Sequence, residues 1–166
     1  MIKGYWDHPL YIQAIVRSIQ SYWTTHRRSE RLLIAFHGLP ESSLKSGDPY
    51  YCLCHKTMRL IREALSLKED EVMLVFQSRF GYQPWLKPYC NETLKTLACD
   101  GVQSVDVVSP GFSMDCLETL EELNQTYREL FLSSGGKQYH YIPALNALDQ
   151  SVDFYHALVD DLRQLS

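Results

Sequence analysis

Short apolar runs that alternate with segments of helical periodicity constrain the fold of this chain more than any other feature. Arg31–His37 and Val72–Phe76 are nearly continuous apolar runs, which is typical of strands buried on both faces. The segments between them carry apolar residues at a 3.6-residue spacing, which favours helices with one buried stripe. Strands joined by such helices run parallel, because each crossover helix returns the chain to the same edge of the sheet.

The complete pattern predicts a three-layer α/β sandwich with a four-stranded parallel sheet, Rossmann-like in type. Helices are expected at 8–26, 50–66, 84–98, 116–132 and 148–165, and strands at 31–37, 72–76, 102–108 and 137–142. The length of 166 residues suits one domain, 1–166, and no linker, repeat or low-complexity tract divides it. Ligands of such sheets bind beyond the carboxyl ends of the strands, so the loops that begin at His37, Gln77 and Ser109 are where a site is expected.

Charge and cysteine usage exclude several classes of protein. Sixteen Lys and Arg against 20 Asp and Glu give a net charge of -4, which provides no basic footprint for DNA or RNA. No apolar run reaches the ~20 residues of a membrane span, and the first residues lack the apolar stretch of a secretory signal. Five cysteines without a paired spacing predict free thiols in a reducing compartment. We therefore expect a cytoplasmic protein.

His37 ends the first predicted strand in the sequence Ala35-Phe-His-Gly-Leu-Pro40. The Gly and Pro force a turn there, which leaves the imidazole at the expected crevice. A histidine that merely hydrogen-bonds the loop is the competing interpretation.

The loop after the second strand gathers Arg79, Phe80, Tyr82 and Trp85 around a glycine. Aromatic rings beside a cation suit a flat, conjugated, anionic ligand, because the rings stack on its face and the guanidinium meets its carboxylates. An aromatic plug that closes the core is the alternative.

Acidic residues follow the third strand. Asp115 is predicted to cap the next helix with Glu118 as its capping-box partner. Glu118 and Glu122 lie at i and i+4, where like charges repel unless a cation or a proton lies between them. The pair therefore serves either a solvated helix face or a metal or proton path. A separate Cys52-Leu-Cys54-His55 motif lacks the further ligands of a closed zinc site, so a metal there is disfavoured.

Taken together, the motifs resemble those of the ferrochelatase family, which inserts ferrous iron into a porphyrin in haem biosynthesis. The motifs occur in the family's order over nearly the whole chain. They are His8-Pro-Leu-Tyr-Ile12, Phe36-His-Gly-Leu-Pro40, Gly47-Asp-Pro-Tyr50, Phe76-Gln-Ser-Arg79, Pro84-Trp-Leu86, Pro110-Gly-Phe112, Asp115-Cys-Leu-Glu-Thr-Leu-Glu-Glu122 and Ile142-Pro-Ala-Leu-Asn146. Family members are about twice as long, and these motifs belong to their carboxyl-terminal half. The resemblance therefore implies a chelatase-like half whose amino-terminal half is missing.

The resemblance also assigns roles. It implies that His37 and Glu118 are catalytic, that His37, Glu118 and Glu122 face the metal, and that Trp85 lines the porphyrin cleft. The pattern of the loop after the second strand adds Arg79 and Tyr82 as candidates for substrate binding. A family position that is often histidine is Cys116 here, which puts a relay or ligand role at that point in doubt. No cysteine follows Cys116, so no iron-sulfur cluster and no tightly bound cofactor are expected, with Fe²⁺ as a substrate.

The resemblance implies porphyrin and ferrous iron as partners, together with the missing half and a peripheral association with the inner membrane. Non-catalytic alternatives are a porphyrin or haem binder, which would not need His37 and Glu118 together, and a metal-storage module centred on Cys52, Cys54 and His55. A cobalt or nickel chelatase for an earlier tetrapyrrole would carry different motifs.

Overall fold

A computed structural model describes residues 4–147 and 149–164. Its centre is a parallel sheet of four strands in the order β2-β1-β3-β4. The strands are β1 Arg31–His37, β2 Val72–Gln77, β3 Ser104–Val108 and β4 Gln138–Ile142. Each pairing is parallel, so the predicted four-stranded parallel sheet is confirmed.

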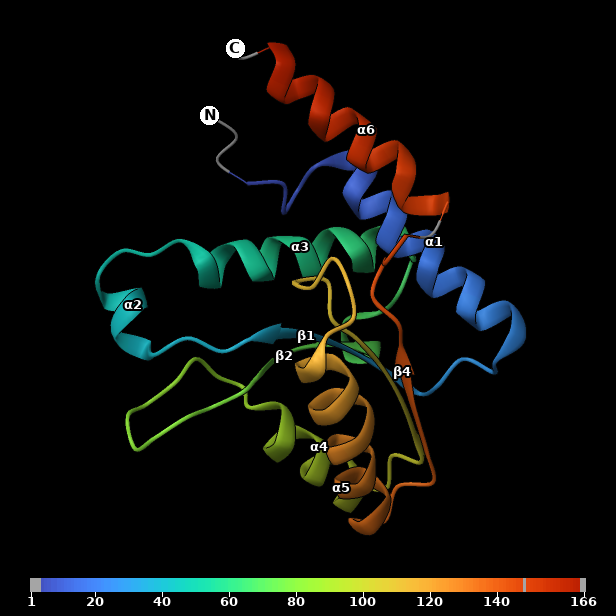
Figure 1. Ribbon diagram of the computed structural model, residues 1–166. Helices are drawn as coiled ribbons and strands as arrows, with labels where there is room; N and C mark the ends of the chain where they lie inside the picture. The colour runs from blue at the N-terminus through green and yellow to red at the C-terminus, as the bar shows by residue number, and fades with distance from the viewer. Residues whose placement is uncertain (1–3, 148, 165–166) are drawn as a thin grey trace.

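Helices cover both faces of the sheet, as Figure 1 shows. On one face lie α1 (Pro9–Thr25), α3 (Tyr50–Ala64) and α6 (Asp149–Gln164), and on the other lie α4 (Cys90–Cys99) and α5 (Tyr127–Ser133) with the π-helix η2 (Glu118–Thr126) that precedes it. The three-layer prediction is thus confirmed. Two residues of the predicted closing helix, 148 and 165, lie outside the described residues.

Side chains of the central strand alternate between two buried cores. Leu32, Ile34 and Phe36 pack with α1 and α3, whereas Leu33 and Ala35 join the core beneath α4 and α5. Successive side chains of a strand point to opposite faces, so His37 continues the Leu33 and Ala35 series. The strand therefore ends with its histidine on the side of α4, η2 and α5.

The third predicted helix begins later than the sequence pattern indicates. We expected it to start at Pro84 or Trp85, but the chain stays irregular to Tyr89 and α4 begins at Cys90. The reason is tertiary: the Leu86 N–H donates to the Leu39 carbonyl at 2.8 Å, and Pro40 and Trp85 form an antiparallel bridge. These bonds use the main chain that a helix would need. A further short helix, α2 (Glu41–Lys45), was not predicted.

The helix after β3 is present but is wound differently from the prediction. Glu118–Thr126 forms a π-helix, and only Tyr127–Ser133 continues as an α-helix. A π-helix bonds residues five apart and is rare, and it is found frequently at functional sites. The i and i+4 argument for Glu118 and Glu122 assumed α-helical spacing, so their surroundings have to be read from the structure.

Candidate active site

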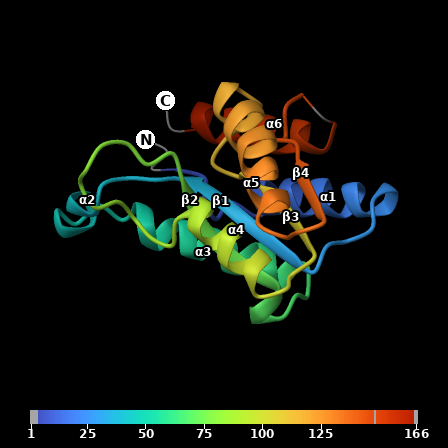
Figure 2. The same cartoon turned by 90° about the horizontal axis from the view of Figure 1, so that it is seen from below.

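The carboxyl ends of β1, β2 and β3 meet at one edge of the sheet, where ligands of open parallel sheets bind. β1 ends at His37, β2 at Gln77 and β3 at Val108. Figure 2 shows α2 and the β2–α4 loop projecting side by side beyond this edge. The predicted loops therefore do come together in the fold.

His37 is half-buried at the end of β1. Its Nδ1 lies 2.7 Å from the carbonyl oxygen of Gly38. Since a carbonyl only accepts, Nδ1 carries the proton, and the lone pair of the neutral ring lies on Nε2. The Tyr50 hydroxyl donates to the His37 carbonyl at 2.9 Å and fixes the main chain behind the ring. The neutral imidazole is thus held in one tautomer, in which Nε2 is the nitrogen that can accept a proton.

Trp85 locks the loop after β2 onto the loop after β1. It is only 8% exposed, and its indole Nε1 donates to the Phe80 carbonyl at 2.8 Å. The hydroxyl of Tyr89 bonds the Trp85 main chain on both sides. Trp85 is therefore buried between the two loops, as the aromatic-plug alternative expects, while the neighbouring Phe80 ring is largely exposed. The assignment of Trp85 to the porphyrin cleft stays a prediction.

The structure does not bring Arg79 and Tyr82 together. The Arg79 guanidinium lies over the Tyr89 ring at 4.7 Å and faces Glu92 at 3.8 Å. Tyr82 is fully exposed at the tip of the loop. Their assignment to substrate binding stays a prediction, because neither side chain contacts His37 in this arrangement of the loop.

Glu118 is exposed at the start of η2. A hydrogen bond from Cys116 lowers the pKa of its carboxyl most, and its own main chain adds to this. Burial opposes them, and His37 lowers the pKa slightly further when its ring is protonated. Glu118 is therefore an ionised carboxylate within electrostatic reach of His37. The fold brings these two predicted residues to the same site.

Glu122 is held against the end of β2 instead of pointing to water. Its Oε1 accepts the Ser78 N–H at 2.9 Å and the Tyr127 hydroxyl at 2.5 Å, and Oε2 accepts the Ser78 hydroxyl. Ser78 adopts a φ of 62°, which turns its N–H toward the carboxylate. Glu118 is thus exposed, as the solvated-face interpretation expects, whereas Glu122 is bonded within the protein. The metal or proton path stays a prediction.

Asp115 does not form the predicted capping box with Glu118. Its N–H bonds Asn146 Oδ1 at 2.8 Å, and its carboxylate accepts from Tyr141, Asn146 and Thr119. Burial alone would raise the pKa of Asp115, but these hydrogen bonds outweigh it and lower the pKa. Asp115 therefore ties the start of η2 to the segment that follows β4.

A groove of about 430 Å³ runs between the β2–α4 loop and η2. Its lining residues come from both segments: Ser78, Arg79, Phe80, Leu117, Glu118, Glu121, Glu122 and Thr126. Two of its lining side chains, Phe80 and Leu117, are largely exposed, and so are Tyr82, Met114 and Leu120 on the neighbouring segments. The site therefore joins acidic groups to an uncovered apolar rim, which suits a flat apolar ligand or a second protein surface.

Sequence reasoning did not identify Ser78, Tyr127 and Gln77 as members of this site. A polar Gln-Ser pair directly after a buried strand is the signal that was available. Their roles depend on η2 crossing over β2, which no local pattern encodes.

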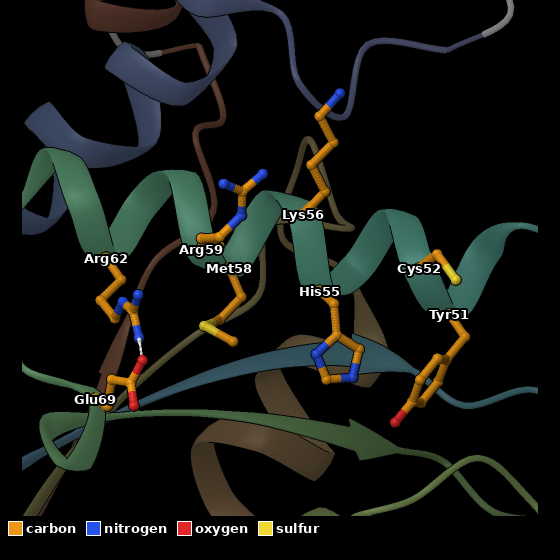
Figure 3. A pocket seen from close by; sticks show the side chains of 8 residues that line it. All are labelled: Tyr51, Cys52, His55, Lys56, Met58, Arg59, Arg62 and Glu69. Atoms are coloured by element: carbon orange, nitrogen blue, oxygen red, sulfur yellow. Dashed lines mark hydrogen bonds and ion pairs between the residues drawn. The ribbon is translucent and has the colours of Figure 1, made fainter.

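The Cys52, Cys54 and His55 alternative gains no support. Cys54 is buried and Cys52 is exposed. Figure 3 shows the His55 ring pointing from α3 toward the sheet, away from Cys52, beside a groove of about 580 Å³. Within residues 4–147 and 149–164, no three His, Cys, Asp or Glu side chains gather as a metal-binding group. The metal role of His37, Glu118 and Glu122 accordingly stays a prediction. No helix in the described part of the chain is long and apolar enough to cross a membrane.

Comparison with solved structures identifies a similar architecture. The chain superposes on SirB from Bacillus subtilis with Fe³⁺ at a TM-score of 0.58, covering 89% of this chain and 53% of that one. The sequences are only 12% identical, so this likeness concerns the fold alone. It agrees with the predicted α/β architecture.

Comparison with known sequences is more specific. The profile of the Ferrochelatase family matches residues 1–162. The ferrochelatase of Nitrosococcus oceani is 53% identical over 99% of this chain and 44% of its own length, and that of Marinobacter nauticus is 52% identical over 96% and 43%. The relative from Proteus mirabilis is 46% identical over 97% of this chain and 50% of its own length. This chain spans about half the length of the curated relatives it matches, and over that half it belongs to the ferrochelatase family.

Proposed function

We propose that this chain is the carboxyl-terminal half of a haem-biosynthetic ferrochelatase and provides the metal-facing wall of its site. The observation that carries this is that His37, with its Nε2 lone pair, ends β1 and that an ionised Glu118 opens the helix after β3 within electrostatic reach of it. The family's substrates, a porphyrin and Fe²⁺, fit that pair. A plain porphyrin binder has no need of a base and a carboxylate together.

Metal insertion has to remove two protons from pyrrole nitrogens, which are weak acids. A pyrrole N–H proton passes to His37 Nε2, and the lone pair left on the pyrrole nitrogen binds Fe²⁺. The same Nε2 lone pair is also a suitable ligand for this borderline-soft ion. Glu118 draws the cation in and takes up protons, because its carboxylate is ionised and exposed.

The exposed rim supports an incomplete site in the isolated chain. Phe80 and Leu117 are 67% and 71% exposed, and a porphyrin needs walls on both faces. We infer that the other half supplies the second wall, and that the isolated chain faces water, which weakens each electrostatic contact. We infer a cytoplasmic location with peripheral membrane contact, for which the exposed rim offers an apolar surface. We also expect no tightly bound cofactor and no iron-sulfur cluster.

A chimera tests the proposal directly. This chain replaces the matching segment of the Nitrosococcus oceani relative, to which it is 53% identical. We expect the chimera to form metalloporphyrin from Fe²⁺ or Zn²⁺ under anaerobic conditions, followed by porphyrin absorbance. The isolated chain should melt cooperatively and bind metal weakly without turnover. A folded chimera that forms no metalloporphyrin would refute the assignment.

Single variants in the chimera assign the roles. His37→Ala should abolish insertion while leaving the melting temperature nearly unchanged, since the ring bonds only the adjacent Gly38 carbonyl in the described contacts. Glu118→Gln should slow insertion more than Glu122→Gln, because Glu118 is the exposed carboxylate beside His37. If both Glu variants insert metal at the unchanged rate, Glu118 and Glu122 have only a structural role.

A further inference from the structure

The side chain of Gln77 presents an unusual burial of polar atoms. Gln77 is 2% exposed, and neither its Nε2 nor its Oε1 has a hydrogen-bond partner among the described residues. Burying an amide without hydrogen bonds is costly, and buried polar groups in folded proteins are nearly always bonded. An amide that has lost both its donor and its acceptor contacts therefore points to a small ligand that supplies both.

Gln77 lies beside His37. The two residues are register partners across β1 and β2, and both continue the series of side chains that face α4 and η2. Neighbouring strands lie about 4.8 Å apart, so side chains of such a pair are direct neighbours. The main chains are also joined, since the Gly38 N–H donates to the Gln77 carbonyl at 2.8 Å.

The nearby carboxylate of Glu122 does not satisfy the Gln77 amide. It accepts the Ser78 N–H, the Ser78 hydroxyl and the Tyr127 hydroxyl. Among the described residues no hydrogen bond joins it to Gln77. The amide therefore needs a partner from outside the chain.

We propose that Gln77 is a positioning residue whose amide holds an internal water molecule beside the His37 imidazole. Water both donates and accepts, so it satisfies the buried amide oxygen and the buried amide NH₂. Resting on the proposed function, this water lies against the imidazole that accepts the pyrrole proton.

Nuclear magnetic resonance of the ¹⁵N-labelled chain tests this without porphyrin or iron. We expect the Gln77 side-chain NH₂ protons to show direct cross-relaxation with a long-lived water. Gln77→Met, which keeps the volume but removes the polar atoms, should shift the His37 ring ¹⁵N resonances and should not raise the melting temperature. Gln13→Met, at an exposed position of α1, is the matched control and should shift neither.

The opposite result is equally defined. If the Gln77 amide shows no water contact, and Gln77→Met melts higher with unchanged His37 resonances, then the amide is simply unsatisfied and the proposal is wrong. Because no substrate is added, this result is independent of the chimera. If the chimera is inactive but Gln77 contacts a long-lived water, only the proposed function is wrong. If the chimera is active but Gln77 shows no water contact, only the positioning role is wrong.

Discussion

Gly38 and Trp85 are packed so closely that the glycine has no space for a side chain. A Cβ at position 38 would lie 3.2 Å from Trp85 Cε3 and 2.8 Å from the Gln77 carbonyl oxygen. The second contact is with main chain, which cannot swing aside. The glycine that turns the chain after His37 is thus also what lets the loops after β1 and β2 meet.

Gly38→Ala should therefore destabilise the protein by about 1–3 kcal/mol, the usual cost of forcing a methyl into a packed position. Urea unfolding measures the change. Gly111→Ala is the control, because a Cβ there meets only Phe36 Cδ1 at an ordinary 3.5 Å. Equal stability of the two variants would mean that the two loops are not held together as described.

Glu122→Gln should destabilise the fold by about 1–3 kcal/mol. The Ser78 N–H and hydroxyl now donate to the two carboxylate oxygens, and in the variant one of these donors would face an amide NH₂, which cannot accept. Glu121→Gln, at an exposed position of the same helix, should change the unfolding free energy by less than about 0.5 kcal/mol. Chemical denaturation of both variants checks this. A neutral effect at Glu122 would show that its bonds to Ser78 and Tyr127 do not persist in solution.

Asp115 should make the protein acid-sensitive. Its folded pKa is lowered, so the stabilisation by this carboxylate is fully present above the unfolded value near about 3.9 and is lost as the pH falls through the folded pKa. Asp115→Asn should cost stability at neutral pH, and that difference should shrink toward about pH 3. Unfolding curves of both proteins across this range measure it. A difference that stays constant with pH would contradict the ionised clamp.

The cysteines should separate into reactive and protected thiols. Cys52 and Cys99 are exposed, whereas burial raises the pKa of Cys54 to about 12 and that of Cys90 still further. Thiol titration near pH 8 should modify Cys52 and Cys99 fast and the half-buried Cys116 more slowly. Cys54 and Cys90 should react only after unfolding, since the thiolate is the nucleophile. Mass spectrometry of the labelled peptides assigns each site.

The sequence by itself determined which segments form strands, that these strands run parallel, and at which edge of the sheet the site is expected. Buried apolar runs such as Arg31–His37 have no other stable placement when helical segments separate them. It also determined which residue types reach that edge, because His37 directly ends a strand and Glu118 opens the helix after another.

Tertiary structure decided what local patterns cannot encode. Pairing of Leu86 with Leu39 keeps 84–89 out of the predicted helix, because the main-chain groups are already used. The π-helical winding of 118–126 places Glu122 against Ser78 and leaves Glu118 exposed, although both are glutamates one α-helical turn apart in sequence. Whether a polar side chain is solvated, bonded or buried without a partner, as Gln77 is, depends on which other segment covers it, and only packing between distant segments sets that.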